Sequence, residues 1–164
     1  MAQHMATSIT LLVLFAFAST RTSGKNLPYT DCASDQAKSS LSINRIVQTP
    51  DRVSIPGEVT AVVEGKALRG ISGGTYKIRV GIKIFWTVVK VWELKGDLCD
   101  KLTHSASCPI SAGERLRIRL YMHIPFFTPR KKVYIHAEAW DEQRRKIACL
   151  KGVVDLRRSR KAIS

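Results

Sequence analysis

The sequence predicts an all-β protein built as one antiparallel β-sandwich, and three observations support that prediction. Apolar and polar residues alternate along several segments between residues 41 and 155, a period of two that is typical of strands with one buried face. Proline and glycine separate these segments, and no helical periodicity extends beyond two turns. Seven or so strands in a domain of about 140 residues fit two packed sheets of an immunoglobulin-like sandwich.

The strands follow one another along the chain with turn signals between them. They are expected at residues 41–48, 58–64, 76–84, 88–94, 115–124, 133–140 and 146–155. In the third and fifth of these segments the apolar residues alternate with basic ones, which are expected to point outward. The outward basic residues are Lys77, Arg79, Lys83, Arg115, Arg117 and Arg119. If the two segments share a sheet they form one large basic patch, and otherwise they are two solvated faces.

The N-terminus contains an apolar run, Ile9 to Phe17, followed by small and polar residues up to Gly24. This pattern is typical of a secretory signal peptide, and the run is too short to span a bilayer. A buried N-terminal strand is the alternative. We therefore divide the chain into a signal peptide (residues 1–24), one domain (25–156) and a basic C-terminal tail (157–164).

The chain carries 27 Lys and Arg against 13 Asp and Glu, which gives a formal net charge of +14. Such a charge favours anionic partners, namely phospholipid headgroups, acidic glycans or nucleic acid. The secretory route makes nucleic acid the least expected of the three. An anionic membrane surface is therefore a predicted partner, and nucleic acid is not.

The four cysteines, Cys32, Cys99, Cys108 and Cys149, permit three pairings in an oxidising compartment. A nested arrangement is favoured, with a local Cys99–Cys108 bridge inside a long Cys32–Cys149 bridge. In the chain-entropy model these would contribute about 2.7 and about 5 kcal/mol. The alternatives are free thiols or a zinc site, but no Cys-x-x-Cys or paired His spacing is present, so no metal or cofactor is expected. Residues 97–113, which contain the local bridge, are called the corner.

Residues 70–74, Gly-Ile-Ser-Gly-Gly, match the Gly-x-Ser-x-Gly pattern of the hydrolase nucleophile elbow. Asp97 and His104 would complete a Ser, Asp, His order. However, the elbow requires a helix after the serine, and the segment that follows is a predicted strand. A structural glycine loop is therefore expected and no enzymatic activity, with an esterase as the alternative.

A second unusual segment combines adjacent aromatic rings with cations. Phe126 and Phe127 lie between two prolines and are followed by Arg130, Lys131 and Lys132. Adjacent residues cannot both point to the same face of a strand, so at least one ring should be exposed or lie at a cavity mouth. Aromatic rings beside cations suit an anionic membrane interface. The alternative is a turn whose rings plug the end of the sandwich.

Several motifs resemble those of the ML-domain lipid-recognition family, over nearly the whole predicted domain. They are Tyr29-Thr30-Asp31-Cys32, Pro56-Gly57, Gly96-Asp97-Leu98-Cys99, Ser107-Cys108-Pro109-Ile110-Ser111-Ala112-Gly113 and Lys146-Ile147-Ala148-Cys149-Leu150. Residues 49–59 and 149–152 are more similar to ganglioside activator proteins. The corner is more similar to the plant, fungal and Niemann-Pick-type sterol-carrier members.

The resemblance implies that the two sheets splay apart and hold a lipid between them, in a mostly apolar pocket. The expected walls are Ile78, Val80, Ile82, Ile84, Leu116, Ile118, Leu120, Met122, Val133 and Ile135, with Trp92 and Trp140 as larger contributors. The expected mouth and membrane contact are Phe126 and Phe127, with Arg130, Lys131 and Lys132 holding headgroups.

The implied function is non-enzymatic. The protein would extract or present a glycolipid or phospholipid in a ganglioside-activator-like manner, as a secreted or lysosomal protein. Its partners would be the lipid, an anionic membrane and either a lysosomal hydrolase or a lipid-accepting membrane protein. The alternatives are a sterol carrier of the same family and a secreted β-sandwich that acts as a receptor ligand or immune co-receptor.

Overall fold

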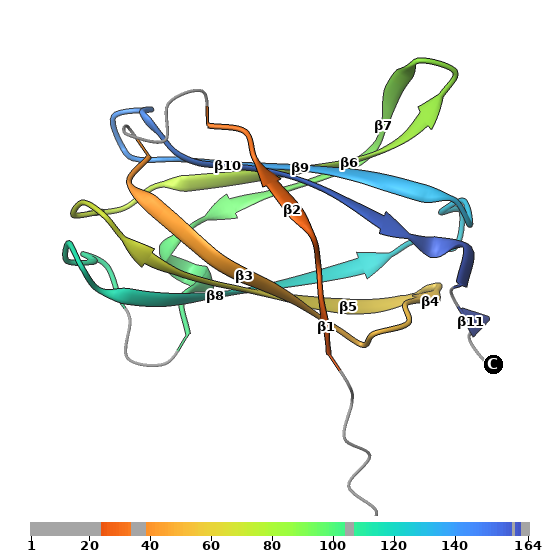
Figure 1. The fold of residues 1–164 in the computed structure, drawn as a ribbon, viewed down its shortest axis with the longest axis horizontal. Coiled ribbons are helices and arrows are strands. Elements are labelled where there is room, and N and C mark those ends of the chain that lie inside the picture. Colours follow the sequence, from red (N-terminus) through yellow and green to blue (C-terminus); the bar gives the residue numbers. More distant parts are fainter. Residues whose placement is uncertain (1–23, 34–38, 104–106, 159, 162–164) are drawn as a thin grey trace, which may run out of the picture.

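The computed structural model describes residues 24–33, 39–103, 107–158 and 160–161. Within these ranges the chain forms two antiparallel sheets packed face to face and no α-helix, so the predicted all-β sandwich is confirmed (Figure 1). The described chain also contains no helix with the length and apolar character needed to span a membrane. The predicted signal peptide lies outside the described residues, apart from Gly24.

The two sheets contain four and five strands. Sheet A has the order β1-β3-β5-β8, with β1 (Lys25–Asn26), β3 (Leu41–Thr49), β5 (Gly57–Ala67) and β8 (Arg115–Ile124). Sheet B has the order β2-β10-β9-β6-β7, with β2 (Tyr29–Asp31), β10 (Lys146–Asp155), β9 (Lys132–Trp140), β6 (Thr75–Ile84) and β7 (Thr87–Asp97). In the predicted basic tail, β11 (Arg160–Lys161) pairs in parallel with β4 (Ser54–Ile55).

The core lies between the sheets because the apolar residues of each strand face inward. In β6, Tyr76, Ile78 and Val80 are only 6%, 4% and 2% exposed, whereas Lys77 and Arg79 between them are half-buried on the outer face. Burying each large apolar side chain contributes roughly 1.5–3 kcal/mol to stability. The alternation seen in the sequence thus fixes which face of each strand is buried.

One short segment, residues 25–31, belongs to both sheets, and we call it the strap. Its first part, β1, pairs with β3 at the edge of sheet A, and its second part, β2, pairs with β10 at the edge of sheet B. The strap therefore crosses the edge of the sandwich between β3 and β10 (Figure 1). Its C-terminal end is fixed because the Cys32 amide donates to the Cys149 carbonyl at 3.0 Å.

Both bridges of the nested disulfide arrangement are present. Cys32–Cys149 attaches the end of the strap to β10, and Cys99–Cys108 closes the corner. The corner leads from β7 in sheet B to β8 in sheet A, so it connects the two layers. It is held further by an isolated bridge between Leu102 and Ile118 of β8.

The outward basic residues do not combine into a single patch. The cations at positions 77, 79 and 83 lie on β6 in sheet B, whereas those at 115, 117 and 119 lie on β8 in sheet A. Two of them pair with acidic residues: Arg117 with Glu64 at 2.6 Å and Arg79 with Glu138 at 3.5 Å. They are two separate faces.

The Gly-x-Ser-x-Gly segment leads directly into strand β6, as expected for a glycine loop. Ser72 Oγ donates to Glu142 Oε2 at 3.4 Å, and His104 lies outside the described residues. Gly74 has a φ of +153°, and a Cβ there would approach the Trp140 carbonyl oxygen to 2.1 Å. The close approach of two backbones therefore accounts for the second glycine of the pattern.

We predict that Gly74→Ala destabilises the protein by roughly 1–3 kcal/mol, because the added methyl group forces the loop away from β9. Gly70→Ala is the matched control: the nearest atom to a Cβ at Gly70 is the Ile110 carbonyl oxygen, 3.8 Å away, and its cost should stay within about 0.5 kcal/mol. Urea unfolding of both variants measures the difference. Equal losses would contradict this explanation of the motif.

Candidate functional site

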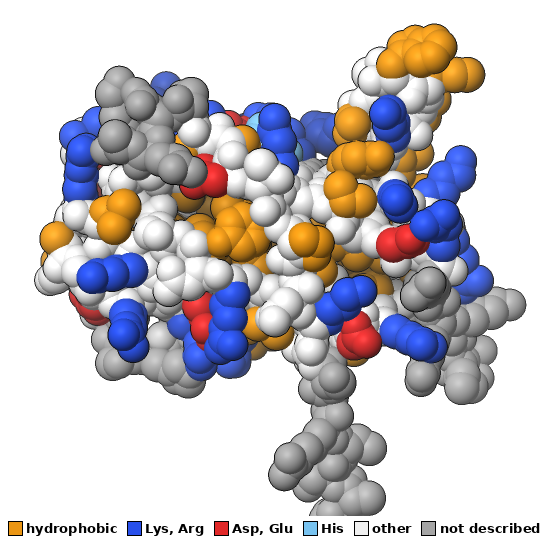
Figure 2. Space-filling model, viewed as in Figure 1, with side chains coloured by type: hydrophobic (Ala, Val, Ile, Leu, Met, Phe, Trp, Pro, Cys, Tyr) orange, Lys and Arg blue, Asp and Glu red, His pale blue; other side chains and the backbone are white. Residues whose placement is uncertain are grey.

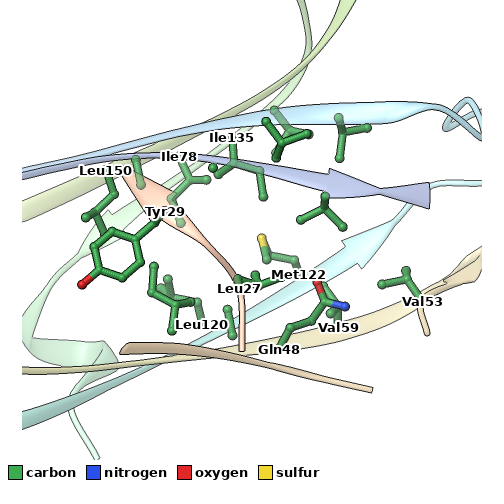
Figure 3. A pocket seen from close by; sticks show the side chains of 18 of the residues that line it. Leu27, Tyr29, Gln48, Val53, Val59, Ile78, Leu120, Met122, Ile135 and Leu150 are labelled. Atoms are coloured by element: carbon green, nitrogen blue, oxygen red, sulfur yellow. The ribbon is translucent and has the colours of Figure 1, made fainter. Parts of the chain in front are cut away.

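A space between the two sheets, which we call the inner cavity, has a volume of about 100 Å³ (Figure 3). Ile78 of β6 and Ile135 of β9 face it from sheet B, and Leu120 and Met122 of β8 face it from sheet A. Apolar side chains form almost all of its wall, so water has few hydrogen-bond partners inside it. The volume is below the roughly 300–1,000 Å³ of typical small-molecule sites.

A second, smaller cavity of about 60 Å³ lies nearer the corner. It reaches Leu98 of the corner and is also lined by Ile118. Both cavities are bordered by Val63, Ile78, Leu120, Ala137 and Leu150. The side chains of this shared boundary separate the two spaces, so a modest outward movement of the sheets would join them.

The strap closes the side of the inner cavity. Leu27, Pro28 and Tyr29 line it, and the Tyr29 hydroxyl donates to the Ile43 carbonyl at 2.7 Å across the gap between the sheets. Figure 2, viewed from the strap side, shows hydrophobic side chains exposed on this face of the molecule. The cavity therefore comes closest to solvent at the strap.

A surface cleft of about 440 Å³ lies beside the strap. It is bounded by the strap, by residues 51–53 and by the end of β10, and it shares Leu27, Gln48, Val53 and Leu156 with the inner cavity. The shared residues place this cleft directly beside the inner cavity, and we call it the entrance cleft because it is a candidate entrance.

Gln48 is a buried polar side chain at the base of the entrance cleft, only 4% exposed. Its amide nitrogen donates to the carbonyl oxygens of Pro50 and Asp51 at 3.1 and 3.3 Å. Because a buried amide is costly to leave unpaired, these bonds hold the β3–β4 loop over the rim.

Two cations and two carboxylates surround the entrance cleft: Lys25, Arg52, Asp51 and Asp155. Asp155 contacts the Arg157 guanidinium, whose hydrogen bonds lower the pKa of that carboxyl well below its usual range. Its negative charge is therefore matched locally by Arg157. Lys25 and Arg52 are exposed and give the outer rim a basic character.

A family model described as the ML domain matches residues 26–156. The chain belongs to the ML-domain family. Its curated relatives include the phosphatidylglycerol/phosphatidylinositol transfer proteins of Neurospora crassa and Pyricularia oryzae. Over 129 residues they are 24% and 22% identical, covering 78% of this chain and 71% and 70% of theirs. The solved structure of a Niemann-Pick type C2 protein from the Japanese carpenter ant has a TM-score of 0.60 at 16% identity, covering 77% of this chain and 96% of that chain.

Seven of the expected wall residues line the inner cavity of this ML domain. They are Ile78, Val80, Trp92, Leu120, Met122, Val133 and Ile135. They come from β6, β7, β8 and β9, so both sheets contribute. In β6, β8 and β9 the period-two alternation places these residues on the face that points toward the other sheet.

The remaining expected residues lie elsewhere. Ile118 lines the smaller cavity, while Leu116 is a buried core residue. Ile82 is half-buried and packs against the core. These three face inward, but they lie beyond the ends of the inner cavity.

Ile84 and Trp140 do not face the interior as expected. Ile84 is 44% exposed because β6 continues past the end of β9. Trp140 pairs with the exposed Thr75 and therefore points to the outer face of sheet B. Its position differs by an odd number from that of Val133, so the alternation already opposed its assignment to the wall.

Sequence reasoning missed the wall formed by the strap, β3, β5 and β10. These residues include Leu27, Pro28, Tyr29, Ile46, Gln48, Val59, Ala61, Val63 and Leu150. Val59, Ala61 and Val63 were detectable as every second residue of a predicted strand, although the apolar Val62 weakens the alternation. The strap gave no such signal, since its strands contain only two and three residues.

The predicted membrane loop connects β8 to β9, and we call residues 125–131 the aromatic loop. Phe126 and Phe127 are 80% and 59% exposed, and their rings contact edge-to-face with centroids 5.5 Å apart. Both rings are exposed, where at least one was expected to be. Neither lines the inner cavity or the entrance cleft, so they do not plug the sandwich.

We predict that Ala61→Phe blocks the inner cavity of the ML domain. Ala61 lines it and is 7% exposed, so a ring at this position occupies the space. The apparent affinity for a fluorescent hydrophobic probe should fall at least tenfold, with the fold retained by circular dichroism. Thr60→Phe, one residue earlier on the outer face of β5, is the matched control. A probe affinity unchanged by Ala61→Phe would show that the probe binds elsewhere.

Proposed function

We propose that this ML-domain protein is a non-enzymatic carrier that holds the acyl chain of an anionic phospholipid between its two sheets. The supporting observation is the apolar inner cavity, which shares part of its lining with a surface cleft that carries exposed cations. The two curated relatives named above, phosphatidylglycerol/phosphatidylinositol transfer proteins, support the choice of a phospholipid. The side chains that line the cavity are mostly apolar and unreactive, which suits transport of a lipid.

A lipid chain needs more room than the cavity of about 100 Å³ provides. The carrier role therefore requires the sheets to move apart, joining the inner cavity to the smaller one beside it. Apolar packing permits such a movement because dispersion and hydrophobic contacts are non-directional. The hydrogen bonds of each sheet run within that sheet and would be kept.

The headgroup would remain at the entrance cleft. Lys25 and Arg52 offer positive charge at its rim, and the strap backbone lies beside them. An arginine suits phosphate especially well because its planar guanidinium can donate two parallel hydrogen bonds. This arrangement would favour phosphatidylglycerol or phosphatidylinositol over a zwitterionic lipid, and over a sterol, which has only a hydroxyl group.

The protein would act in the secretory pathway, as a secreted or lysosomal protein. Two disulfides suit that compartment. Its membrane contact would include Phe126 and Phe127, with Arg130, Lys131 and Lys132 holding headgroups. A lysosomal hydrolase or a lipid-accepting membrane protein would receive the lipid.

Lipid extraction tests this function directly. Purified protein incubated with vesicles of phosphatidylglycerol and phosphatidylcholine, then separated and examined by native mass spectrometry, should carry phosphatidylglycerol at about one molecule per protein. Vesicles that also contain cholesterol or ganglioside test the alternative cargoes. Selective uptake of either would replace the phospholipid proposal, and protein that takes up no lipid at all would contradict the carrier role.

The double variant Lys25→Gln/Arg52→Gln tests the headgroup position. We expect it to lose most of the preference for phosphatidylglycerol over phosphatidylcholine while still extracting lipid, because the apolar cavity is unchanged. Lys66→Gln/Arg115→Gln, which removes two exposed cations away from the entrance cleft, is the charge-matched control. A preference retained by the double variant would place the headgroup elsewhere.

A further inference from the structure

The hairpin formed by β6 and β7 extends beyond the sheet that it belongs to. The last pair between β6 and β9 is Ile82 with Val133, yet β6 and β7 continue to pair as far as Ile84 with Thr87. A bulge between Val80 and Gly81 interrupts the pairing below the tip, and bulges bend and twist a hairpin. Figure 1 shows the resulting tip projecting away from the sandwich.

The projecting tip is hydrophobic and exposed. Phe85 and Trp86 form the turn and are 82% and 90% exposed. Ile84, Val88 and Val89 beside them are 44%, 50% and 45% exposed. Figure 2 shows this apolar tip standing clear of the rest of the surface.

The turn itself does not explain these aromatic residues. A two-residue hairpin turn requires a left-handed backbone at one or both positions, for which Gly, Asn or Asp is favoured. Phe85 has this left-handed backbone, with a φ of 53°, although the conformation is costly for a bulky side chain. An aromatic residue there weakens the fold and exposes apolar surface. Its role is therefore expected to be a contact with something outside the sandwich.

The tip lies at the same end of the sandwich as the aromatic loop. The pairing of Ile82 with Val133 brings the base of the tip next to the start of β9, which follows that loop. Exposed cations accompany both features. Lys83 and Lys90 lie on the hairpin, and Arg130, Lys131 and Lys132 follow the two aromatic residues of the aromatic loop. Two apolar projections with cations behind them therefore share one end.

We propose that the β6–β7 tip inserts into anionic bilayers and, with the aromatic loop, attaches the protein to the membrane by this end. Aromatic rings partition into the interface while cations contact anionic headgroups, and both terms add to binding. A protein partner fits less well, because five exposed apolar residues are far fewer than the roughly 20–30 residues that each partner contributes to a stable interface. A second copy would bring like-charged lysines together.

This attachment would also orient the entrance cleft. Gly57 pairs with Ile124, and the Leu156 amide donates to the Lys131 carbonyl at 3.0 Å. The segment before β5 and Leu156, which borders the cleft, therefore lie at the end that carries the two projections. This orientation rests on the proposed carrier function, whereas attachment by the tip does not.

Vesicle co-sedimentation with phosphatidylglycerol and phosphatidylcholine tests the attachment. We expect Phe85→Ser/Trp86→Ser to weaken binding by about 100-fold, since each buried aromatic side chain is worth at least about tenfold. Leu68→Ser is the matched control, because Leu68 is 50% exposed and follows β5 at the other end. It should bind vesicles like the natural sequence, and both variants should keep their melting temperature.

Tryptophan fluorescence adds a readout of insertion. The natural protein should show a blue shift and quenching by lipids brominated in the acyl chain, and Trp86→Phe should lose most of that signal while still binding. Undiminished vesicle binding by Phe85→Ser/Trp86→Ser would overturn the proposal. So would natural protein that self-associates in solution through the tip and binds vesicles without it.

The two proposals fail separately in these measurements. Ala61→Phe should bind vesicles normally but carry no lipid, whereas Phe85→Ser/Trp86→Ser should still take up a short-chain phosphatidylglycerol presented in solution. If the tip variant binds vesicles weakly and the natural protein carries no lipid, attachment stands and the carrier role does not.

Discussion

The apolar packing between the two sheets is the interaction on which the rest of this structure depends. It buries the inward rows of both sheets without tying them to each other by directional bonds, and it leaves two small cavities between them. Hydrogen bonds that join the layers lie at the margins: at the β3–β10 edge Tyr29 donates to Ile43 and Ser39 to Ile147, and at the corner Thr103 donates to Arg117. The layers are thus fixed along one edge and at the corner, and are held by non-directional contacts between.

The two ends of the sandwich also differ in how firmly the two layers are joined. One end carries the corner, where the Cys99–Cys108 bridge and the pairing of Leu102 with Ile118 join the layers. The other end carries the aromatic loop, the β6–β7 tip and the entrance cleft, and it has no disulfide among the residues described. The corner therefore lies away from the entrance, where it is suited to limit separation of the sheets.

Alternation was sufficient to predict the strands and the sandwich, because both depend on local pattern, whereas the cysteine spacing favoured the nested bridges but left two other pairings open. Seven residues of the inner cavity were predicted by combining the inward rows with the resemblance to the ML-domain family. The prediction of inward-facing residues was wrong at Ile84, because β6 extends beyond β9 there. It was also wrong at Trp140, which lies an odd number of residues from Val133 and therefore faces outward. The strap and the hairpin tip were not predicted. The strap depends on pairing with both sheets, and the exposure of the tip depends on where β9 begins, and neither can be read from the pattern of a single strand.

The claim that the sheets separate to admit a lipid is tested most directly by the distance between them in solution. Spin labels on Thr60 of β5 and Tyr134 of β9, on the outer faces of the two sheets, report that distance by pulsed electron resonance. A second pair on Lys66 and Lys77, towards the corner, is the reference. Loading with phosphatidylglycerol should lengthen the first distance and leave the second nearly unchanged. Lipid-loaded protein with an unaltered first distance would contradict the account.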